Sequence, residues 1–286
     1  MNRIKATRSK QARAVVGLTL LLTLSPCHLV TLSTRAGDGE EAAEANRLCE
    51  TELSRWQLSS DGTKLANPTA PVLRWTNPAV GRLYGNTYLW LDDGRPVAVG
   101  CMYRFYDPFQ TFNGELALLA GSGMVAKRGE RELWRPSVKW KWTDVPDAPV
   151  PAATRAGRLF QMRSLAKRFG VVVLDSRNVR KPEGVTPRLL AKPLYRYDQG
   201  ESKSLDGALY AFVLGTDPEL MLLLECDTGQ GNPRWRFGVG RMNRDAVRLT
   251  LGKETVWERS SLEEDNPEDG EYRFFDLGLA GEGRDE

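Results

Sequence analysis

Acidic side chains are the residues of this chain with the clearest capacity for chemistry. Two carboxylates about 5–10 Å apart can cleave a glycosidic bond, one acting as acid and the other as base or nucleophile. Asp92 with Asp93, and Asp206 with Asp217, are the candidate pairs. However, Gly94 follows Asp93 directly, and Gly215 stands two residues before Asp217. Asp and Gly so placed are typical of turns, where they are selected for backbone conformation. The turn interpretation is favoured, so no catalytic residue is assigned.

The sequence contains few residues that could carry out imidazole or thiolate chemistry. The only histidine is His28, and without it Ser-His-Asp and Cys-His catalysis as usually built is excluded. Cys49, Cys101 and Cys226 are widely separated and form no Cys-x-x-Cys pair, so we predict no metal or cofactor site. They allow one disulfide with one free thiol, but the favoured interpretation is three buried small apolar residues. Cys101 and Cys226 should face opposite sides of equivalent strands.

Three other motifs are incomplete. Residues 265–276 resemble a calcium loop, but Pro267 stands where the third ligand belongs and the last position is Asp rather than Glu. Ser122 lacks the full nucleophile-elbow pattern and a histidine partner. No Gly-rich phosphate loop of standard spacing occurs.

Tryptophan is frequent, and aromatic platforms bind sugars and extended peptides. Trp140 and Trp142 alternate with Lys139 and Lys141 and have no counterpart in the internal match described below. We therefore predict that these two side chains form an exposed pair and a candidate contact surface.

The clearest helix is predicted at residues 152–169, and it has one apolar and one basic face. The apolar stripe consists of Leu159, Met162, Leu165, Ala166 and Phe169. The basic residues are Arg155, Arg158, Arg163, Lys167 and Arg168. They could bind phosphate, anionic polysaccharide or headgroups, but a solvated face near the acidic residues 263–271 is the favoured interpretation.

The N-terminal segment predicts export. A basic region up to Arg13 precedes an apolar run, residues 14–24, and a small-x-small site ends at Ala36, so residues 1–36 read as a removed signal peptide. An uncleaved anchor through Val30, or lipidation of Cys27, are the alternatives. The whole chain has 40 basic and 37 acidic residues, and six of the basic ones lie in this segment. The mature chain is then slightly acidic, which predicts no nucleic-acid partner. Because Ser25, Pro26, Cys27 and His28 interrupt the apolar run, we also expect no transmembrane segment in the mature chain.

The chain also matches itself at an offset of 122–123 residues. Pro71, Arg74, Gly85, Tyr88 and Pro96 fall on Pro193, Arg196, Gly207, Tyr210 and Pro218. Identical Gly and Pro positions mark backbone geometry, so we predict an internal duplication. The fold class is α+β, with two tandem helix-plus-antiparallel-sheet units.

The predicted boundaries follow from this match. They are a signal peptide 1–36, a first unit 37–143, a Pro-rich linker 144–152, a second unit 153–258 and an acidic C-terminal tail 259–286. The first helix is expected at 40–58. Strands are expected at 72–75, 86–91, 97–105, 112–119, 124–128, 132–134 and 139–142, then at 193–197, 208–214, 219–226, 234–241, 246–251, 255–257 and 272–275. The run 220–224 is apolar without alternation, so both of its faces should be covered.

Several segments resemble a large paralogous family of exported planctomycete proteins. These are residues 205–219, Arg241-Met242-Asn243, 73–78 and 158–163, and the resemblance spans about residues 70–258. The sequence departs from the family pattern at Cys101-Met102-Tyr103. The resemblance implies export and a shared fold, and it transfers no active site because the family has no characterised function.

The sequence thus predicts an exported protein, periplasmic, extracellular or attached to the cell envelope, that binds without catalysis. Its partner would be an envelope polymer or protein, and the default ligand site would be the cleft between the units. A carboxylate-based hydrolase of envelope polymers and a structural or assembly component are the alternatives. The sequence indicates no oligomeric state.

Overall fold

The computed structural model describes residues 38–174, 183–198, 205–227, 232–262, 267 and 269–278. The predicted signal peptide, with Cys27 and His28, lies outside these residues. The rest of the chain, from Ala36 onward, forms one compact unit rather than two separate ones. Among the described residues, neither helix is long and apolar enough to cross a membrane.

Two helices and eighteen strands make up the described chain, which confirms the mixed α+β class. Up to residue 144 the elements are α1 (Asp38–Leu53), β1 (Trp56–Ser60), β2 (Thr63–Lys64), β3 (Leu73–Thr76), β4 (Arg82–Asp92), β5 (Arg95–Asp107), β6 (Phe112–Leu118), β7 (Val125–Arg128), β8 (Arg131–Trp134) and β9 (Thr143–Asp144). Then follow α2 (Arg155–Ala166), β10 (Phe169–Leu174), β11 (Arg188–Leu189), β12 (Tyr195–Asp198), β13 (Leu205–Leu214), β14 (Asp217–Asp227), β15 (Arg234–Arg241), β16 (Ala246–Leu251), β17 (Glu254–Arg259) and β18 (Tyr272–Asp276).

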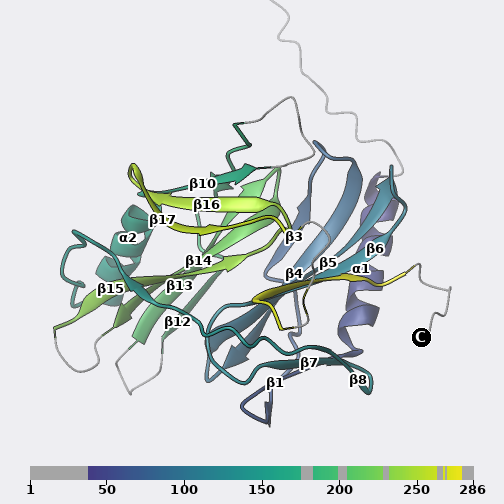
Figure 1. The fold of residues 1–286 in the computed structure, drawn as a ribbon, viewed down its shortest axis with the longest axis horizontal. Helices are drawn as coiled ribbons and strands as arrows, with labels where there is room; N and C mark the ends of the chain where they lie inside the picture. The colour runs from purple at the N-terminus through teal and green to yellow at the C-terminus, as the bar shows by residue number, and fades with distance from the viewer. Residues whose placement is uncertain are drawn as a thin grey trace, which may run out of the picture. The chain divides into compact units, whose positions relative to one another are not determined.

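The strands form two large and two small antiparallel sheets (Figure 1). The first large sheet has the order β18-β6-β5-β4-β3, and the second has the order β11-β13-β14-β15-β9, with β12 also paired to β13. The small sheets are β2-β1-β7-β8 and β10-β16-β17. The consecutive strands β3 to β6 therefore pair in the same order as β12 to β15.

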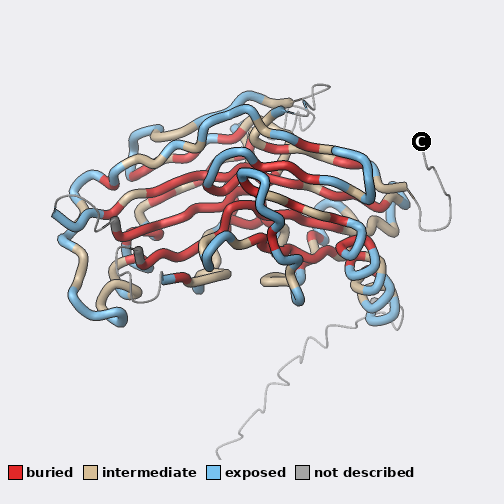
Figure 2. Tube along the Cα trace, turned by 90° about the horizontal axis from the view of Figure 1, so that it is seen from below, coloured by how far each residue is buried: buried red, intermediate tan, exposed pale blue. Residues whose placement is uncertain are grey.

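The two large sheets share one hydrophobic core. In β14, Met221 and Leu223 belong to this shared core, whereas Leu220, Leu222 and Leu224 pack under α2 and the β10-β16-β17 sheet. All five side chains are buried, which confirms that both faces of this strand are covered. A third core lies between the first large sheet, α1 and the β1–β7 sheet. Figure 2 shows the buried residues concentrated in the long strands, with exposed segments outside them.

Side chains of both large sheets fill the space between the sheets. The described residues therefore do not form the cleft between two units that was predicted as the default ligand site. Trp75, Val99 and Cys101 from the first sheet pack in one cluster with Leu209 and Leu223 from the second. Any ligand site of this sandwich must therefore lie at its ends or its outer surface.

The last strand of each half pairs with the sheet of the other half. In the predicted C-terminal tail, β18 pairs with β6 of the first large sheet, where it appears yellow in Figure 1. Next to the predicted linker, β9 pairs with β15 of the second large sheet, and Val145 is buried in the core beneath α2. Strands β9 and β18 therefore belong to the large sheets, although they lie in or beside the predicted linker and tail.

The three cysteines lie in three different cores and none is disulfide-bonded. Cys49 packs in the core under α1, Cys101 in the shared core and Cys226 in the core under α2. Cys101 and Cys226 thus lie on opposite faces of their sheets, as predicted. Burial raises the pKa of the Cys49 thiol to about 12 and that of Cys101 well above its ordinary value.

We therefore expect three unreactive thiols in the folded protein. Because only the thiolate reacts quickly and burial blocks access, a disulfide reagent should label none of the three cysteines within minutes at pH 8. After unfolding in guanidinium, all three should react. Rapid labelling of only one or two thiols in the unfolded mature protein would contradict this assignment, because it would reveal a disulfide.

Candidate functional site

Asp92 and Asp93 lie in a hairpin turn and make no catalytic pair. They join β4 to β5, and Asp93 and Gly94 both adopt positive φ, 45° and 75°. Two consecutive positive φ angles are typical of the tight turns that match strand twist. Asp92 and Asp93 are exposed, so the turn interpretation holds for this segment.

Asp206 is a structural carboxylate held by two arginines. It is buried on β13, and it accepts hydrogen bonds from Arg158 Nε at 2.6 Å and from Arg196 Nε at 3.0 Å. In the register of β13 and β14, Asp206 stands opposite Cys226, and Asp217 stands opposite Leu214 at the other end of the same hairpin. At about 3.3 Å per residue the two carboxylates are roughly 25 Å apart along the strand, which excludes the Asp206–Asp217 pair.

Replacing Asp206 tests this structural role. We expect Asp206→Asn to lower the free energy of unfolding by about 1.5–3 kcal/mol, because two part-buried guanidinium groups lose their charged acceptor. Asp198→Asn is the matched control, since Asp198 is exposed and pairs with the exposed Arg155. Urea unfolding of both variants measures the difference, and equal losses would contradict the assignment.

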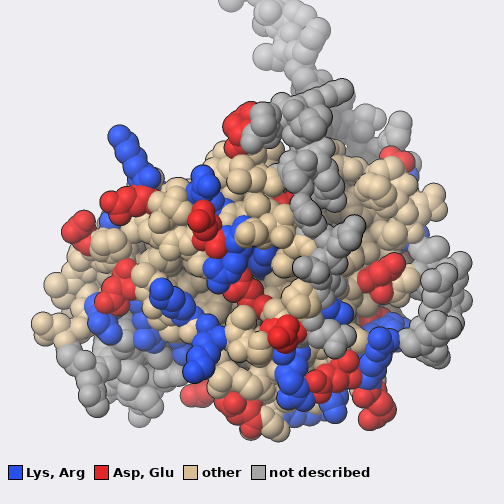
Figure 3. Space-filling view, viewed as in Figure 1, with Lys and Arg blue, Asp and Glu red and all other residues tan. Residues whose placement is uncertain are grey.

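Three of the five basic residues of the predicted helix are engaged within the protein, and one of them, Arg168, lies just beyond the end of α2. Arg155 and Arg158 pair with Asp198 and Asp206, and Arg168 donates to the backbone of Pro146 at 2.8 Å. The countercharge comes from β12 and β13, whereas residues 263–266 and 268 of the predicted acidic partner segment lie outside the described residues. Basic and acidic side chains are interspersed over the face seen in Figure 3.

Trp140 and Trp142 are not the exposed pair that their spacing predicts. They precede the short β9, both are half-buried, and their ring centroids lie 5.8 Å apart. Trp140 covers Gly238, where an added Cβ would meet the indole at 2.3 Å. An edge-strand position beside β15 explains this, because the rings turn inward onto the sheet.

Trp142 lies against a group of paired charges at one end of the sandwich. We call this group of Glu225, Arg95 and Arg236, with Tyr197 and Trp142, the guanidinium end. Glu225 on β14 is fully buried and accepts from Arg95 Nε at 2.8 Å and from Arg236 Nε at 3.1 Å. The Tyr197 hydroxyl donates to the same carboxylate at 2.5 Å. Both guanidinium groups also lie against the Trp142 ring, 4.9 and 4.8 Å from its centroid.

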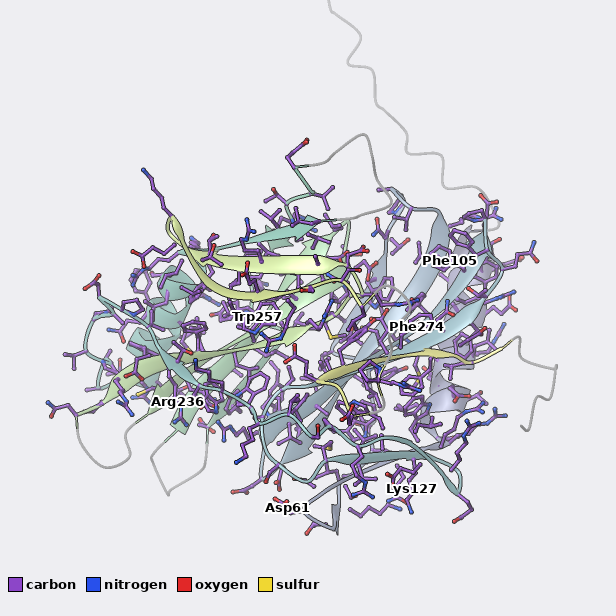
Figure 4. All side chains as sticks on the ribbon, in the orientation of Figure 1. Asp61, Phe105, Lys127, Arg236, Trp257 and Phe274 are labelled. Atoms are coloured by element: carbon purple, nitrogen blue, oxygen red, sulfur yellow. The ribbon has the colours of Figure 1, made fainter. Side chains whose placement is uncertain are left out.

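The other end carries acids where the guanidinium end carries a cation. Asp217 is the first residue of β14, and Arg95 is the first residue of β5. Tyr103 in β5 and Glu225 in β14 also occupy equivalent positions, the same number of residues after the start of their strands. Glu115 on β6 and Glu219 on β14 accompany Asp217. We call these three acids with their neighbours the carboxylate end. Figure 4 shows Arg236 and Phe105, one from each end, on opposite sides of the molecule.

Each acid of the carboxylate end accepts a hydrogen bond from a neutral donor. Tyr103 Oη donates to Glu115 at 3.1 Å and Asn77 Nδ2 donates to Asp217 at 3.3 Å. Asn243 Nδ2 donates to Glu219 at 3.0 Å. Each of these hydrogen bonds favours the ionised acid, but less than a cation would, because the donors are neutral.

Burial and mutual repulsion raise the pKa of all three acids. Desolvation raises the pKa of Glu115 to about 8, and the negative charge of Glu219 adds to it. Desolvation, followed by the charge of Glu115, raises the pKa of Asp217 well above its ordinary value. Desolvation, followed by the charge of Asp217, does the same for the pKa of Glu219. At neutral pH this end therefore retains protons that exposed acids would have lost.

A line of aromatic rings leads from this end to the surface. Trp75 lies over Gly85 and its ring centroid is 5.3 Å from that of Tyr103. Tyr103 is followed by Phe105 at 5.9 Å, and Phe105 by Phe109 at 5.4 Å. The exposed fraction rises from 5% at Trp75 to 66% at Phe109, so the line joins the shared core to solvent.

Metal binding and serine chemistry find no support in the geometry. Across the part of the chain that the structure describes, no group of three or more His, Cys, Asp or Glu side chains is placed to hold a metal ion. Ser122 Oγ donates to Asp61 Oδ2 at 2.9 Å between two loops. The proposed calcium loop lies partly outside the described residues, and its Tyr272 and Asp276 pair within a strand.

No family model, curated protein or solved structure matches this chain. The candidate site therefore depends on the geometry alone.

Sequence reasoning considered Asp217 only as a partner of Asp206 and favoured a turn role for it, and it missed Glu115, Glu219 and Tyr103. The available signal was an acid inside an apolar strand, since Glu115 interrupts Phe112–Leu118 and Glu219 immediately precedes the apolar run of β14. An acid in a buried strand must be paired or protonated, and that requirement marks both positions.

Proposed function

We propose that this protein is an exported binding protein of the cell envelope, and that its carboxylate end is the ligand site. The observation that carries this proposal is the aromatic line from Trp75 to Phe109 beside three raised-pKa acids. Exposed aromatic rings next to polar side chains supply contact area and orientation for a ligand. Export rests on the predicted signal peptide at residues 1–36.

Internal duplication is part of the proposal. It is supported by the common order of β3–β6 and β12–β15, and by the reciprocal pairing of β9 and β18. Under duplication, the two ends of the sandwich descend from one ancestral position. One end then acquired the Arg95–Glu225 pair and the other kept an unneutralised acid, Asp217. Kinship with the exported planctomycete family is proposed on its sequence motifs.

A carboxylate hydrolase is the second candidate, because an acid with a pKa near 8 is protonated at neutral pH and can act as general acid. Glycoside cleavage also needs a second carboxyl group that is ionised. A catalytic pair is therefore recognised by one acid with a raised pKa and another whose pKa stays low. Here the pKa values of Glu115, Asp217 and Glu219 are all raised. Binding is therefore favoured over hydrolysis, and an assembly role would use the same surface for a protein partner.

Affinity capture from the native envelope tests the binding function. The bait is the protein, alongside Phe109→Ser and the control Phe160→Ser, whose side chain is similarly exposed on α2. We expect a reproducible polymer or protein that the wild type and Phe160→Ser retain and Phe109→Ser loses. Equal capture by all three baits would place the ligand site elsewhere.

A further inference from the structure

We propose that the carboxylate end binds a primary ammonium group carried on an apolar stem, and that each binding event releases a proton to solvent. This inference rests on the proposed binding function and names the ligand class of the same site.

The first argument is the contrast in charge between the two ends. At the guanidinium end the hairpin turn of the first sheet delivers Arg95 to Glu225, and the carboxylate is neutralised within the chain. At the carboxylate end the equivalent turn of the second sheet delivers Asp217 instead. The cation that the fold supplies at one end is thus replaced by an acid at the other, and a ligand cation would restore the balance.

The second argument is a buried acceptor that has no donor. The Asn77 side chain is 2% exposed, and its Nδ2 donates to Asp217 at 3.3 Å. Its Oδ1 has no hydrogen-bond partner among the described residues, and the same holds for Oδ1 of Asn243. An unpaired buried acceptor is costly, and an ammonium group offers three N–H donors to such oxygens.

The third argument concerns the stem of the ligand. A cation over an aromatic face is attracted by the ring, and an alkyl stem packs on apolar rings. The Tyr103 ring, whose hydroxyl contacts Glu115, begins the aromatic line that Phe105 and Phe109 continue toward solvent. The exposed Val80 lies in the neighbouring loop, adjacent to Gly81, which packs on Asp107 and Pro108. A metal ion would use none of these apolar surfaces, and the described acids do not form a metal group.

Proton release follows from the groups around Glu115. The titratable and charged side chains that face this carboxyl or its immediate partners are Cys101, Tyr103, Asp217, Glu219, Arg241, Arg244, Asp245 and Tyr272. The acids outnumber the bases here, so Glu115 holds its proton near neutral pH. A cation placed beside Glu115 stabilises the carboxylate, and the proton leaves to the buffer.

Calorimetry with n-pentylamine at pH 7 tests the inference, in two buffers of different ionisation enthalpy. We expect saturable binding and a buffer-dependent heat that reports about one released proton. Neutral n-pentanol should bind at least about tenfold more weakly, which corresponds to about 1.4 kcal/mol. Glu115→Gln should abolish the proton release, and Phe109→Ser, an exposed change that leaves the core intact, should weaken binding of the amine.

The matched control is Glu132→Gln, since Glu132 is an exposed acid of β8 that pairs with Arg135, and its replacement should change nothing. Absence of amine binding would overturn the inference, as would equal affinity for the alcohol or unchanged proton release in Glu115→Gln. If the alcohol binds as well as the amine and Phe109→Ser weakens both, the inference fails while the proposed binding function stands.

Discussion

Glu225→Gln is expected to lower the free energy of unfolding by about 3–5 kcal/mol, the range observed when one partner of a buried ion pair is removed. Glu225 is fully buried and accepts from Arg95, Arg236 and Tyr197. The two guanidinium side chains are only 21% and 20% exposed, so neither can recover its hydration in place. The substitution leaves two cations without their common anion.

The measurement is urea or thermal unfolding at pH 7. Glu258→Gln is the control, because that acid is 65% exposed and pairs with Arg248 at the surface, where ion pairs contribute about 0–1 kcal/mol. A loss for Glu225→Gln no larger than that of the control would mean that the guanidinium end does not hold the two sheets together.

The strand core of this fold could be predicted because its periodicity is strong. The predicted strands 234–241 and 246–251 match β15 and β16 at both ends, and the apolar run at 220–224 is covered on both faces. Burial on two faces leaves a continuous apolar run, which a single sequence displays directly.

The helix boundaries failed for an identifiable reason. The prediction extended the first helix to Leu58 and the second to Phe169, whereas they end at Leu53 and Ala166. Trp56 and Phe169 each begin a strand, β1 and β10, yet both remain in the core that the preceding helix covers. A residue that stays on the buried side after the helix ends extends the helical pattern artificially.

The candidate site could not be predicted because its members meet through packing between sheets. Asp217 begins β14 directly after a turn of the second sheet, and Asn77 lies in a loop of the first sheet, 140 positions away in sequence. Only the approach of the two hairpins joins them, and neither residue type is unusual in its own segment. The pairing of β9 with β15 and of β18 with β6 also joins segments that are far apart in sequence. Because local sequence does not reveal such pairing, the segment 140–142 was predicted to be exposed.

The carboxylate end predicts an unusual dependence of stability on pH. An acid whose pKa is higher in the folded than in the unfolded protein binds more protons when folded, so its stabilising contribution is complete below the unfolded pKa. For Glu115 that contribution is lost as the pH rises from about 4.5 toward about 8. Asp217 and Glu219 act in the same direction, because the pKa of each is raised in the folded protein.

We therefore expect the free energy of unfolding to fall between pH 5 and pH 8, by up to about 1.4 kcal/mol per pH unit for each extra proton held. The measurement is urea unfolding across this range at constant ionic strength. Glu115→Gln should flatten the curve and be more stable than the wild type at pH 8, since glutamine carries no charge to desolvate. Glu130→Gln, an exposed change, should reproduce the wild-type slope.

The sign of the slope tests whether Glu115 holds its proton near neutral pH in the folded protein. Acids that are paired with cations have lowered pKa values when folded, and they make a protein more stable as the pH rises from acid toward neutral. A wild-type curve that rises between pH 5 and pH 8, and that Glu115→Gln leaves unchanged, would mean that Glu115 is ionised and neutralised within the chain. The carboxylate end would then resemble the guanidinium end, and it would have no unmet charge for a ligand cation to satisfy.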